Sequence, residues 1–86
     1  MIMLPLLAGV VTSNAEEMDV SKAVFYVSWY DVGKAALVGL NGVISVEKGF
    51  LSSKEINTVF YDPSIITIKE MKKALKNAGT YQGMVE

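Results

Sequence analysis

The chain of 86 residues contains no cysteine, no histidine and no arginine, and its eight basic residues are all lysine. Without thiolate or imidazole ligands, the usual protein sites for zinc and copper cannot form. Disulfides, cysteine nucleophiles and triads with a histidine base are excluded for the same reason. Without arginine, no guanidinium can hold a phosphate or carboxylate through paired hydrogen bonds. These absences exclude many classes of enzyme and of metal carrier.

The charge balance argues against a nucleic-acid partner. Eight lysines face nine acidic residues and the net charge is −1, whereas nucleic-acid binding draws most of its affinity from basic groups. The segment 56–61 contains Phe60 and Tyr61 but no lysine, so it lacks the basic residues expected beside aromatics that stack on RNA bases. We therefore predict that no nucleic acid binds.

The first 15 residues carry no charge and are rich in apolar side chains. Their apolar run is too short to span a bilayer, which needs about 20 residues. Ser13-x-Ala15 matches the small-x-small rule of a signal peptidase site. We therefore predict that residues 1–15 are the remnant of a signal peptide, that Glu16 begins the mature chain, and that the protein is exported, to the periplasm or another extracytoplasmic space. An additional N-terminal strand or core helix is the alternative.

A strand and a helix are predicted first in the remaining chain. Ala23–Trp29 is rich in β-branched and aromatic residues, which favour a strand, and Phe25 and Val27 share one of its faces. Asp31 is placed to cap a helix that runs to about Leu40. The apolar residues of this helix recur at helical spacing, and they are Val32, Ala35, Ala36 and Leu40.

A hairpin follows. Val43–Leu51 is predicted to be a strand with Ile44, Val46 and Phe50 on one face. Ile56–Tyr61 is predicted to be its hairpin partner, since only a short polar turn separates the two segments.

The clearest local signal lies beyond the hairpin. Asp62-Pro63 favours a turn and ends the strand. Thr67 and Glu70 then have the spacing of a capping box, and Ile66 and Met71 are placed to form the hydrophobic staple that accompanies it. The sequence therefore predicts a second helix that begins just after Thr67.

Gly79 is predicted to end this second helix, and Thr80–Val85 to return as a last strand. Residues 16–86 thus follow the order βαββαβ in one domain. We predict an α+β fold of the ferredoxin-like type, a four-stranded antiparallel sheet with two helices on one face.

Three segments carry a family resemblance. They are Gly42-Val43-x-x-Val46, Val59-Phe60-Tyr61-Asp62-Pro63, and the run Ile66-Thr67-x-x-x-Met71-x-x-Ala74-Leu75-x-x-Ala78-Gly79-x-Tyr81. In order and spacing, they resemble the heavy-metal-associated domain family, which includes the periplasmic mercuric-ion-binding protein, the copper chaperones and the N-terminal modules of soft-metal pumps. The resemblance covers residues 23–82, and it implies the ferredoxin-like fold and a link to metal transport or homeostasis.

The chain departs from this family at its metal site. The family binds metal through G-M-x-C-x-x-C between the first strand and the first helix, where this chain has Ser28-Trp29-Tyr30-Asp31-Val32-Gly33. We predict that the metal loop has been shortened away. The cysteine-based metal role is therefore carried over to no residue, and we predict neither a metal ligand nor a cofactor.

Four residues form the candidate site, an interaction patch at the position of the lost loop. They are Trp29, Tyr30, Asp31 and Tyr81. Tryptophan and tyrosine are common anchors of protein interfaces, so we expect a protein partner, such as a membrane metal transporter, at this patch or at an exposed strand edge. A homodimer through the sheet edge is a further expectation. The alternative is that the aromatic residues fill the gap left by the loop while Asp31 caps the helix.

Two other functions are alternatives to this interaction role. A hard cation could bind oxygen ligands such as Asp31 and glutamates. A small enzyme on this fold, of the acylphosphatase type, would need an arginine to hold phosphate, and so we predict no enzyme activity and no small-molecule substrate. The five methionines form no methionine-rich run, which disfavours a thioether copper site.

Overall fold

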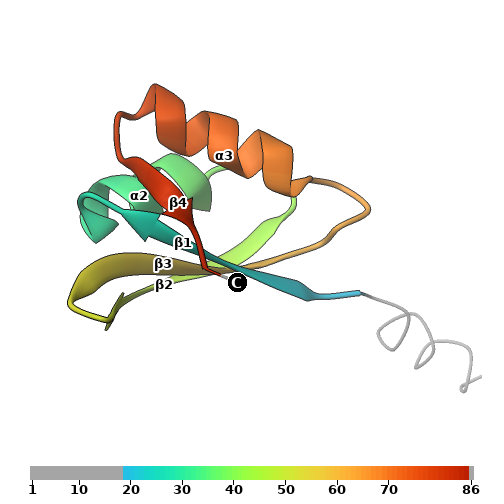
Figure 1. Cartoon of the computed structure of the whole chain (residues 1–86). Helices are drawn as coiled ribbons and strands as arrows, with labels where there is room; N and C mark the ends of the chain where they lie inside the picture. The colour runs from blue at the N-terminus through green and yellow to red at the C-terminus, as the bar shows by residue number, and fades with distance from the viewer. Residues whose placement is uncertain (1–18, 86) are drawn as a thin grey trace, which may run out of the picture.

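The computed structural model describes residues 19–85, which fold into four strands and two helices (Figure 1). In chain order these are β1 (Ser21–Val27), α2 (Tyr30–Val38), β2 (Val43–Leu51), β3 (Lys54–Tyr61), α3 (Ile68–Asn77) and β4 (Tyr81–Met84). The strands form one antiparallel sheet in the order β2-β3-β1-β4, and both helices cover the same face. The predicted ferredoxin-like fold is confirmed. The predicted signal segment, residues 1–15, lies outside the described residues.

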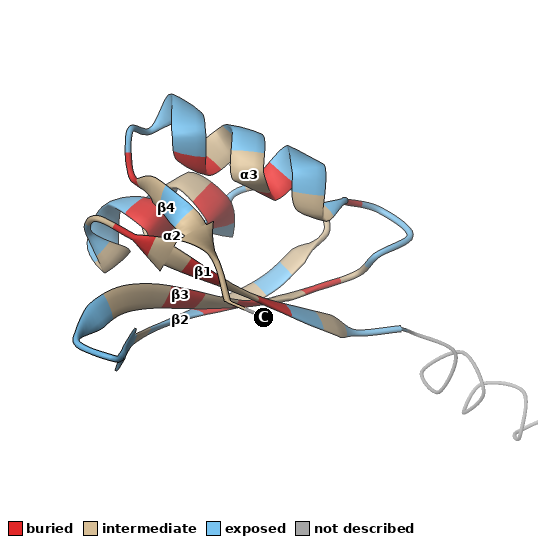
Figure 2. Ribbon diagram, viewed as in Figure 1, coloured by how far each residue is buried: buried red, intermediate tan, exposed pale blue. Residues whose placement is uncertain are grey.

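The core lies between the helices and the sheet. Figure 2 shows buried segments in both helices and in the strands they cover. The buried hydrophobic side chains are Ala23, Phe25, Val27, Leu37, Val46, Val59, Tyr61, Ile66, Met71 and Leu75. Alternate residues of β1 and β3 supply half of this set, as expected for a sheet covered on one face only. The prediction that Phe25 and Val27 point the same way is confirmed.

A two-residue turn joins β2 to β3. Leu51 pairs with Lys54, and the intervening Ser52 and Ser53 have φ values of 52° and 64°. Two successive residues at positive φ are typical of the type I′ turn, whose twist matches that of the flanking strands. The turn fixes the register of the hairpin, and therefore which side chains of β2 face the helices.

Of the three residues predicted to share one face of β2, Val46 and Phe50 lie on the side of the helices and Ile44 does not. Val46 is buried, but Ile44 is 48% exposed and Phe50 is 65% exposed. The pairing of β2 with β3 shifts between Val43 and Ser45, so Ile44 lies in a bulge that turns it away from the core. Phe50 lies one residue from the hairpin turn, where its ring meets that of Tyr30, the first residue of α2.

The apolar face of α2 is also displaced from the prediction. The helix begins at Tyr30, with Trp29 rather than Asp31 at the N-cap, and its buried residues are Gly33 and Leu37. Val32, predicted to face inward, is 38% exposed. The reason is Gly33, which lacks a side chain and so lets the helix backbone lie close to β3. The spacing of apolar residues along a helix does not reveal a buried glycine of this kind.

The start of α3 follows the prediction. The backbone N–H of Glu70 donates to Thr67 Oγ1 at 3.1 Å, and that of Thr67 donates to Glu70 Oε1 at 2.9 Å. Ile66 and Met71 are both buried in the same core cluster, as a hydrophobic staple requires. Gly79, at φ +74°, follows the helix end. Neither helix in the described part of the chain is long and apolar enough to cross a membrane.

Candidate interaction surface at the junction of β1 and α2

The junction between β1 and α2 is the shortest link between a strand and a helix in the described chain. Only Ser28 and Trp29 separate the last residue of β1 from the first residue of α2. The sequence predicts the interaction patch at this link. None of the six residues from Ser28 to Gly33, which span the link and the first turn of α2, is a cysteine.

A buried threonine holds this junction from the β4 side. Thr80, which is fully buried, accepts a hydrogen bond from the Trp29 backbone N–H at 3.0 Å, and its hydroxyl donates to the Trp29 carbonyl at 3.4 Å. The Ser28 N–H donates to the Thr80 carbonyl at 2.8 Å. The backbone on both sides of the junction is therefore paired, which restricts its movement.

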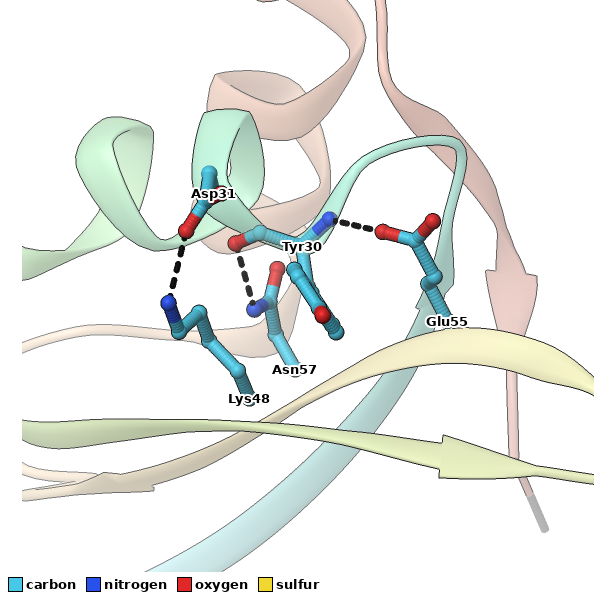
Figure 3. Close-up of polar contacts among 5 residues, drawn as sticks. All are labelled: Tyr30, Asp31, Lys48, Glu55 and Asn57. Atoms are coloured by element: carbon cyan, nitrogen blue, oxygen red, sulfur yellow. Dashed lines mark hydrogen bonds and ion pairs between the residues drawn. The ribbon is translucent and has the colours of Figure 1, made fainter.

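Two side chains of β3 hold the start of α2, as Figure 3 shows. The Tyr30 N–H donates to Glu55 Oε1 at 2.7 Å, and Asn57 Nδ2 donates to the Tyr30 carbonyl at 3.1 Å. Glu55 thus supplies both an acceptor and a negative charge at the helix N-terminus, where each is favourable. The prediction that Asp31 caps this helix is corrected, because the cap comes from another strand.

Asn57 also explains the glycine in α2. The side chain of Asn57 is fully buried, and its Oδ1 has no hydrogen-bond partner. This oxygen lies against Gly33, where an added Cβ would collide with it. The close approach of helix and strand therefore depends on the absence of a side chain at Gly33.

An aromatic patch, defined here as Trp29, Tyr30 and Phe50, lies on the outside of this junction. Trp29 is 61% exposed. The ring of Tyr30 meets that of Phe50 edge-on, with centroids 5.5 Å apart, and Lys48 Nζ lies 5.3 Å from the Tyr30 ring centroid. Exposed aromatic side chains held in place by their neighbours can anchor a protein partner. Sequence reasoning did not include Phe50 in the site, because alternation in β2 predicts the face that it shares with Val46 and not its contact with Tyr30.

Asp31 lies next to this patch and forms an ion pair. Lys48 Nζ donates to Asp31 Oδ1 at 2.7 Å, joining α2 to β2. This hydrogen bond, and then the charge of Asp31, raise the pKa of the Lys48 ammonium above 10.5. Both side chains are substantially exposed. Asp31 therefore neutralises a lysine at this position.

Tyr81 lies apart from the other three predicted residues. Its ring packs edge-on against Phe25, with centroids 6.3 Å apart, and Lys76 Nζ lies 5.4 Å from its centroid. The hydrogen bonds that reach Trp29 from this part of the chain come from the preceding residue, Thr80. The structure thus brings Trp29, Tyr30 and Asp31 together with Phe50, and places Tyr81 beside the core.

A hollow of about 300 Å³ lies beside the aromatic patch. The residues that line it are Tyr26, Val27, Ser28, Phe50, Ser53, Lys54, Glu55 and Gln82. This volume is at the lower limit of the range for small-molecule sites.

The carboxylates of the described residues are not gathered into a ligand cluster. No three side chains of the types His, Cys, Asp and Glu are grouped as ligands between residues 19 and 85. Asp31 pairs with Lys48, and Glu55 accepts from the Tyr30 amide. The carboxylates considered for a hard cation therefore have other partners.

Comparisons with known proteins relate this geometry to metal-handling domains. No model of a known protein family matches the chain, and no curated protein does. A copper-binding domain from HMA7, a P-type ATPase, is 21% identical over 76% of this chain and 93% of that domain, with a TM-score of 0.61.

Oxidised MerP from Ralstonia metallidurans CH34 is also similar. It is 18% identical over 79% of this chain and all of that protein, with a TM-score of 0.65. At these identities the similarity establishes the fold. The chain therefore has the ferredoxin-like fold of heavy-metal-associated domains, without a single cysteine to form their CxxC metal motif.

Proposed function

We propose that this chain is an exported interaction module of a metal-transport or metal-homeostasis system, and that it does not itself carry metal on thiolates. The observation that carries the proposal is the junction of β1 and α2. Its two residues, Ser28 and Trp29, are tied down by hydrogen bonds and present an exposed indole. A position that holds metal in the similar family is here a rigid aromatic surface.

The aromatic patch supports docking of a protein. Trp29, the chain neighbour of Tyr30, and Phe50, which packs on the Tyr30 ring, are both more than half exposed. Large apolar side chains left in water are common at interaction sites. Phe50 packs against the Tyr30 ring, Lys48 Nζ lies over that ring, and Thr80 holds the backbone of Trp29. A surface that is already ordered loses less conformational entropy on binding.

The nature of the partner is inferred from the fold. One of the similar structures is a copper-binding domain of a P-type ATPase. A metal transporter of the membrane is therefore the partner that we propose, and the apolar N-terminal segment supports a location outside the cytoplasm. An exported module without thiolates would regulate or tether such a transporter rather than deliver metal to it.

Native mass spectrometry of the whole chain tests the metal part of this proposal. The chain is measured alone and with Cu(I), Hg(II), Zn(II) and Ca(II). We expect no stoichiometric adduct that survives a competing chelator. A stable adduct of one soft metal ion per chain would overturn the proposal. A calcium adduct that disappears in Asp31→Ala would instead favour a hard-cation site.

Tryptophan fluorescence tests the docking part. Trp29 is the single tryptophan of the chain, so its emission reports on the patch alone. Titration with a tryptophan-free variant of a copper-binding domain from a P-type ATPase should shift the emission to shorter wavelength, in a saturable way, and should reduce quenching by acrylamide. Phe50→Ser should weaken this response, and Ile65→Ser, at an exposed apolar residue outside the patch, should not. An unsaturable response, or equal effects of the two substitutions, would contradict docking at the patch.

A further inference from the structure

Helix α3 carries half of the lysines of the chain on one side. The four are Lys69, Lys72, Lys73 and Lys76. They lie three or four residues apart and therefore share a face of the helix. The side chains that α3 buries, Met71 and Leu75, lie on its other side. We call this row the lysine stripe, and Figure 2 shows the outer side of α3 exposed to solvent.

None of these lysines is ion-paired within residues 19–85. The ion pair of this part of the chain joins a lysine of β2 to Asp31. Lys76 Nζ lies 5.4 Å from the centroid of the Tyr81 ring, which leaves its charge uncompensated. Glu70, the one acidic residue of α3, is held by the capping box at the helix start. The lysine stripe is therefore a positive surface without a carboxylate partner in the described chain.

Positive charge is gathered on the helices of a chain that is acidic as a whole. The two helices hold five of the eight lysines but only two of the nine acidic residues. Both of these acidic residues are engaged, Asp31 with Lys48 and Glu70 in the capping box. The helix layer is therefore net positive, whereas the rest of the chain is net negative.

The stability of the helix does not account for the stripe. Like charges three or four residues apart repel one another and destabilise a helix, and the four lysines form four such pairs. Lys69 also lies in the first turn, where the helix dipole disfavours a cation. A partner that presents several negative charges would relieve this repulsion.

We propose that the lysine stripe binds the surface of a membrane that contains anionic lipids. Such a surface offers many phosphate groups that can move beneath each ammonium, so it demands no fixed geometry. Lysine, a hydrated point charge on a flexible stem, suits contacts of this kind. Protein interfaces are instead enriched in arginine and depleted of lysine, and this chain has no arginine. An anionic lipid surface is therefore favoured over an acidic protein.

The outer side of α2 permits close approach to such a surface. Both helices cover the same face of the sheet (Figure 1). Gly33 and Leu37 of α2 are buried, whereas Ala35 and Gly39, on the opposite side of that helix, are exposed and uncharged. This side neither repels phosphate nor loses the hydration of a charge on contact. The inference goes beyond the proposed function, since the lysine stripe lies on α3 and not at the aromatic patch.

Sedimentation of the full chain with lipid vesicles tests this inference. Neutral phosphatidylcholine vesicles are compared with vesicles in which about one third of the lipid is anionic phosphatidylglycerol. We expect stronger binding to the anionic vesicles at low salt, and loss of this excess at about 1 M salt, where charges are screened beyond about 3 Å. Binding to neutral vesicles measures what uncharged segments such as residues 1–15 contribute. Equal binding to the two kinds of vesicle would overturn the proposal.

Two variants of equal net charge locate the binding surface. Lys69→Gln/Lys73→Gln removes two charges from the lysine stripe, and Lys22→Gln/Lys54→Gln removes two from β1 and β3. All four side chains are exposed. A lysine close to an anionic surface strengthens binding about fivefold. We therefore expect the excess binding to fall about tenfold or more in the stripe variant and less than about twofold in the control. Equal losses would show an effect of net charge alone and would overturn the proposal.

The absence of native cysteine permits a direct test of orientation. Asn77→Cys on α3 and Thr58→Cys on β3 each carry an environment-sensitive fluorescent label. Thr58 lies between Asn57 and Val59, which are buried under the helices, so it points to the opposite side of the sheet. Anionic vesicles should shift the emission of the label at position 77 and not of that at position 58. Equal shifts at the two positions would contradict the proposed orientation.

Soluble polyglutamate separates a membrane from an acidic protein as the partner. If polyglutamate binds the parent chain through the lysine stripe, while anionic vesicles bind it no better than neutral ones, the membrane proposal fails and an acidic protein takes its place. None of these measurements includes a metal ion or a transporter domain. Membrane binding and the proposed function can therefore fail separately.

Discussion

Glu55 on β3 accepts a hydrogen bond from the backbone N–H of Tyr30 at 2.7 Å and so caps a helix that is 25 residues away in the sequence. The N-cap residue of α2, Trp29, forms no capping hydrogen bond, because its side chain has no suitable acceptor. The start of the helix, and with it the aromatic patch, is therefore held by the sheet.

Removal of this cap should destabilise the protein measurably. Glu55→Ala should lower the free energy of unfolding by about 1–2 kcal/mol, as the loss of an N-cap acceptor does, and Glu55→Gln should lower it less. Denaturant unfolding followed by circular dichroism measures both. Glu47→Ala, at an exposed carboxylate on the neighbouring strand, should stay within about 0.5 kcal/mol of the parent at low protein concentration. Equal losses for Glu55→Ala and Glu47→Ala would show that the contact is not stabilising.

A methyl group at Gly33 should be costly. Gly33→Ala places a Cβ against Asn57 Oδ1, and overpacking of this kind costs about 1–3 kcal/mol. The gain in helix propensity recovers about 1 kcal/mol at most. At Gly39 an added Cβ meets nothing within 4 Å and φ is −90°, so Gly39→Ala should be neutral or stabilising. Thermal unfolding of the two variants compares them directly.

Removal of the colliding Asn57 side chain should offset the cost of Gly33→Ala. In a chain that already carries Asn57→Ala, the further change Gly33→Ala should cost much less than it does alone, because the colliding oxygen is gone. A double-mutant cycle measures this coupling. Additive effects would show that the two residues do not interact as the structure describes.

Loss of the Thr80 hydroxyl should loosen the junction. Thr80→Val keeps the shape of a fully buried side chain but removes both hydrogen bonds to Trp29. An unpaired buried amide costs about 1–3 kcal/mol, and the emission of Trp29 should change as its backbone gains freedom. Ser64→Ala, at an exposed hydroxyl away from the junction, should leave the emission unchanged.

Asp62 should make stability depend on pH in the acid range. Hydrogen bonds from the Ser64 hydroxyl and then from the Ser64 N–H hold the pKa of the Asp62 carboxyl below 3.8. Its contribution to stability is therefore present above pH 3.8 and is lost as the pH falls through the lower pKa of the folded state. Asp62→Ala should lower stability at neutral pH, and the difference from the parent should shrink in acid.

NMR titration checks the origin of this shift. Ser64→Ala should bring the pKa of Asp62 back toward 3.8, because the largest cause of the shift is the hydroxyl. An unchanged pKa would show that the charge of the carboxylate is stabilised by other groups.

Local interactions explain which features of the structure could be predicted from the sequence. The bounds of β2 are those predicted, and the capping box of Thr67 and Glu70 forms as its spacing required. Both depend on residues close in sequence. The order of the elements predicted the fold, because a short hairpin and right-handed crossovers leave few arrangements.

Contacts between segments distant in the sequence account for the features that the sequence analysis did not predict. The burial of Asn57 and the cap from Glu55 depend on how closely α2 approaches β3, and no pattern within either segment states that distance. Asn57 does occupy the inward alternation of Val59 and Tyr61, so a polar residue there was a signal of a specific contact. Phe50 was predicted to share a face with Val46, and alternation does not say whether a helix covers it there.

The sequence alone determined the absence of thiolates, the order of strands and helices, and the capping of α3, because each depends on composition or on neighbours in the chain. Only the tertiary structure decided that the junction of β1 and α2 is closed by Glu55, Asn57 and Thr80, and that Phe50 packs against Tyr30. Those outcomes depend on the distance between a helix and a sheet, which a glycine at position 33 sets through the side chain it lacks.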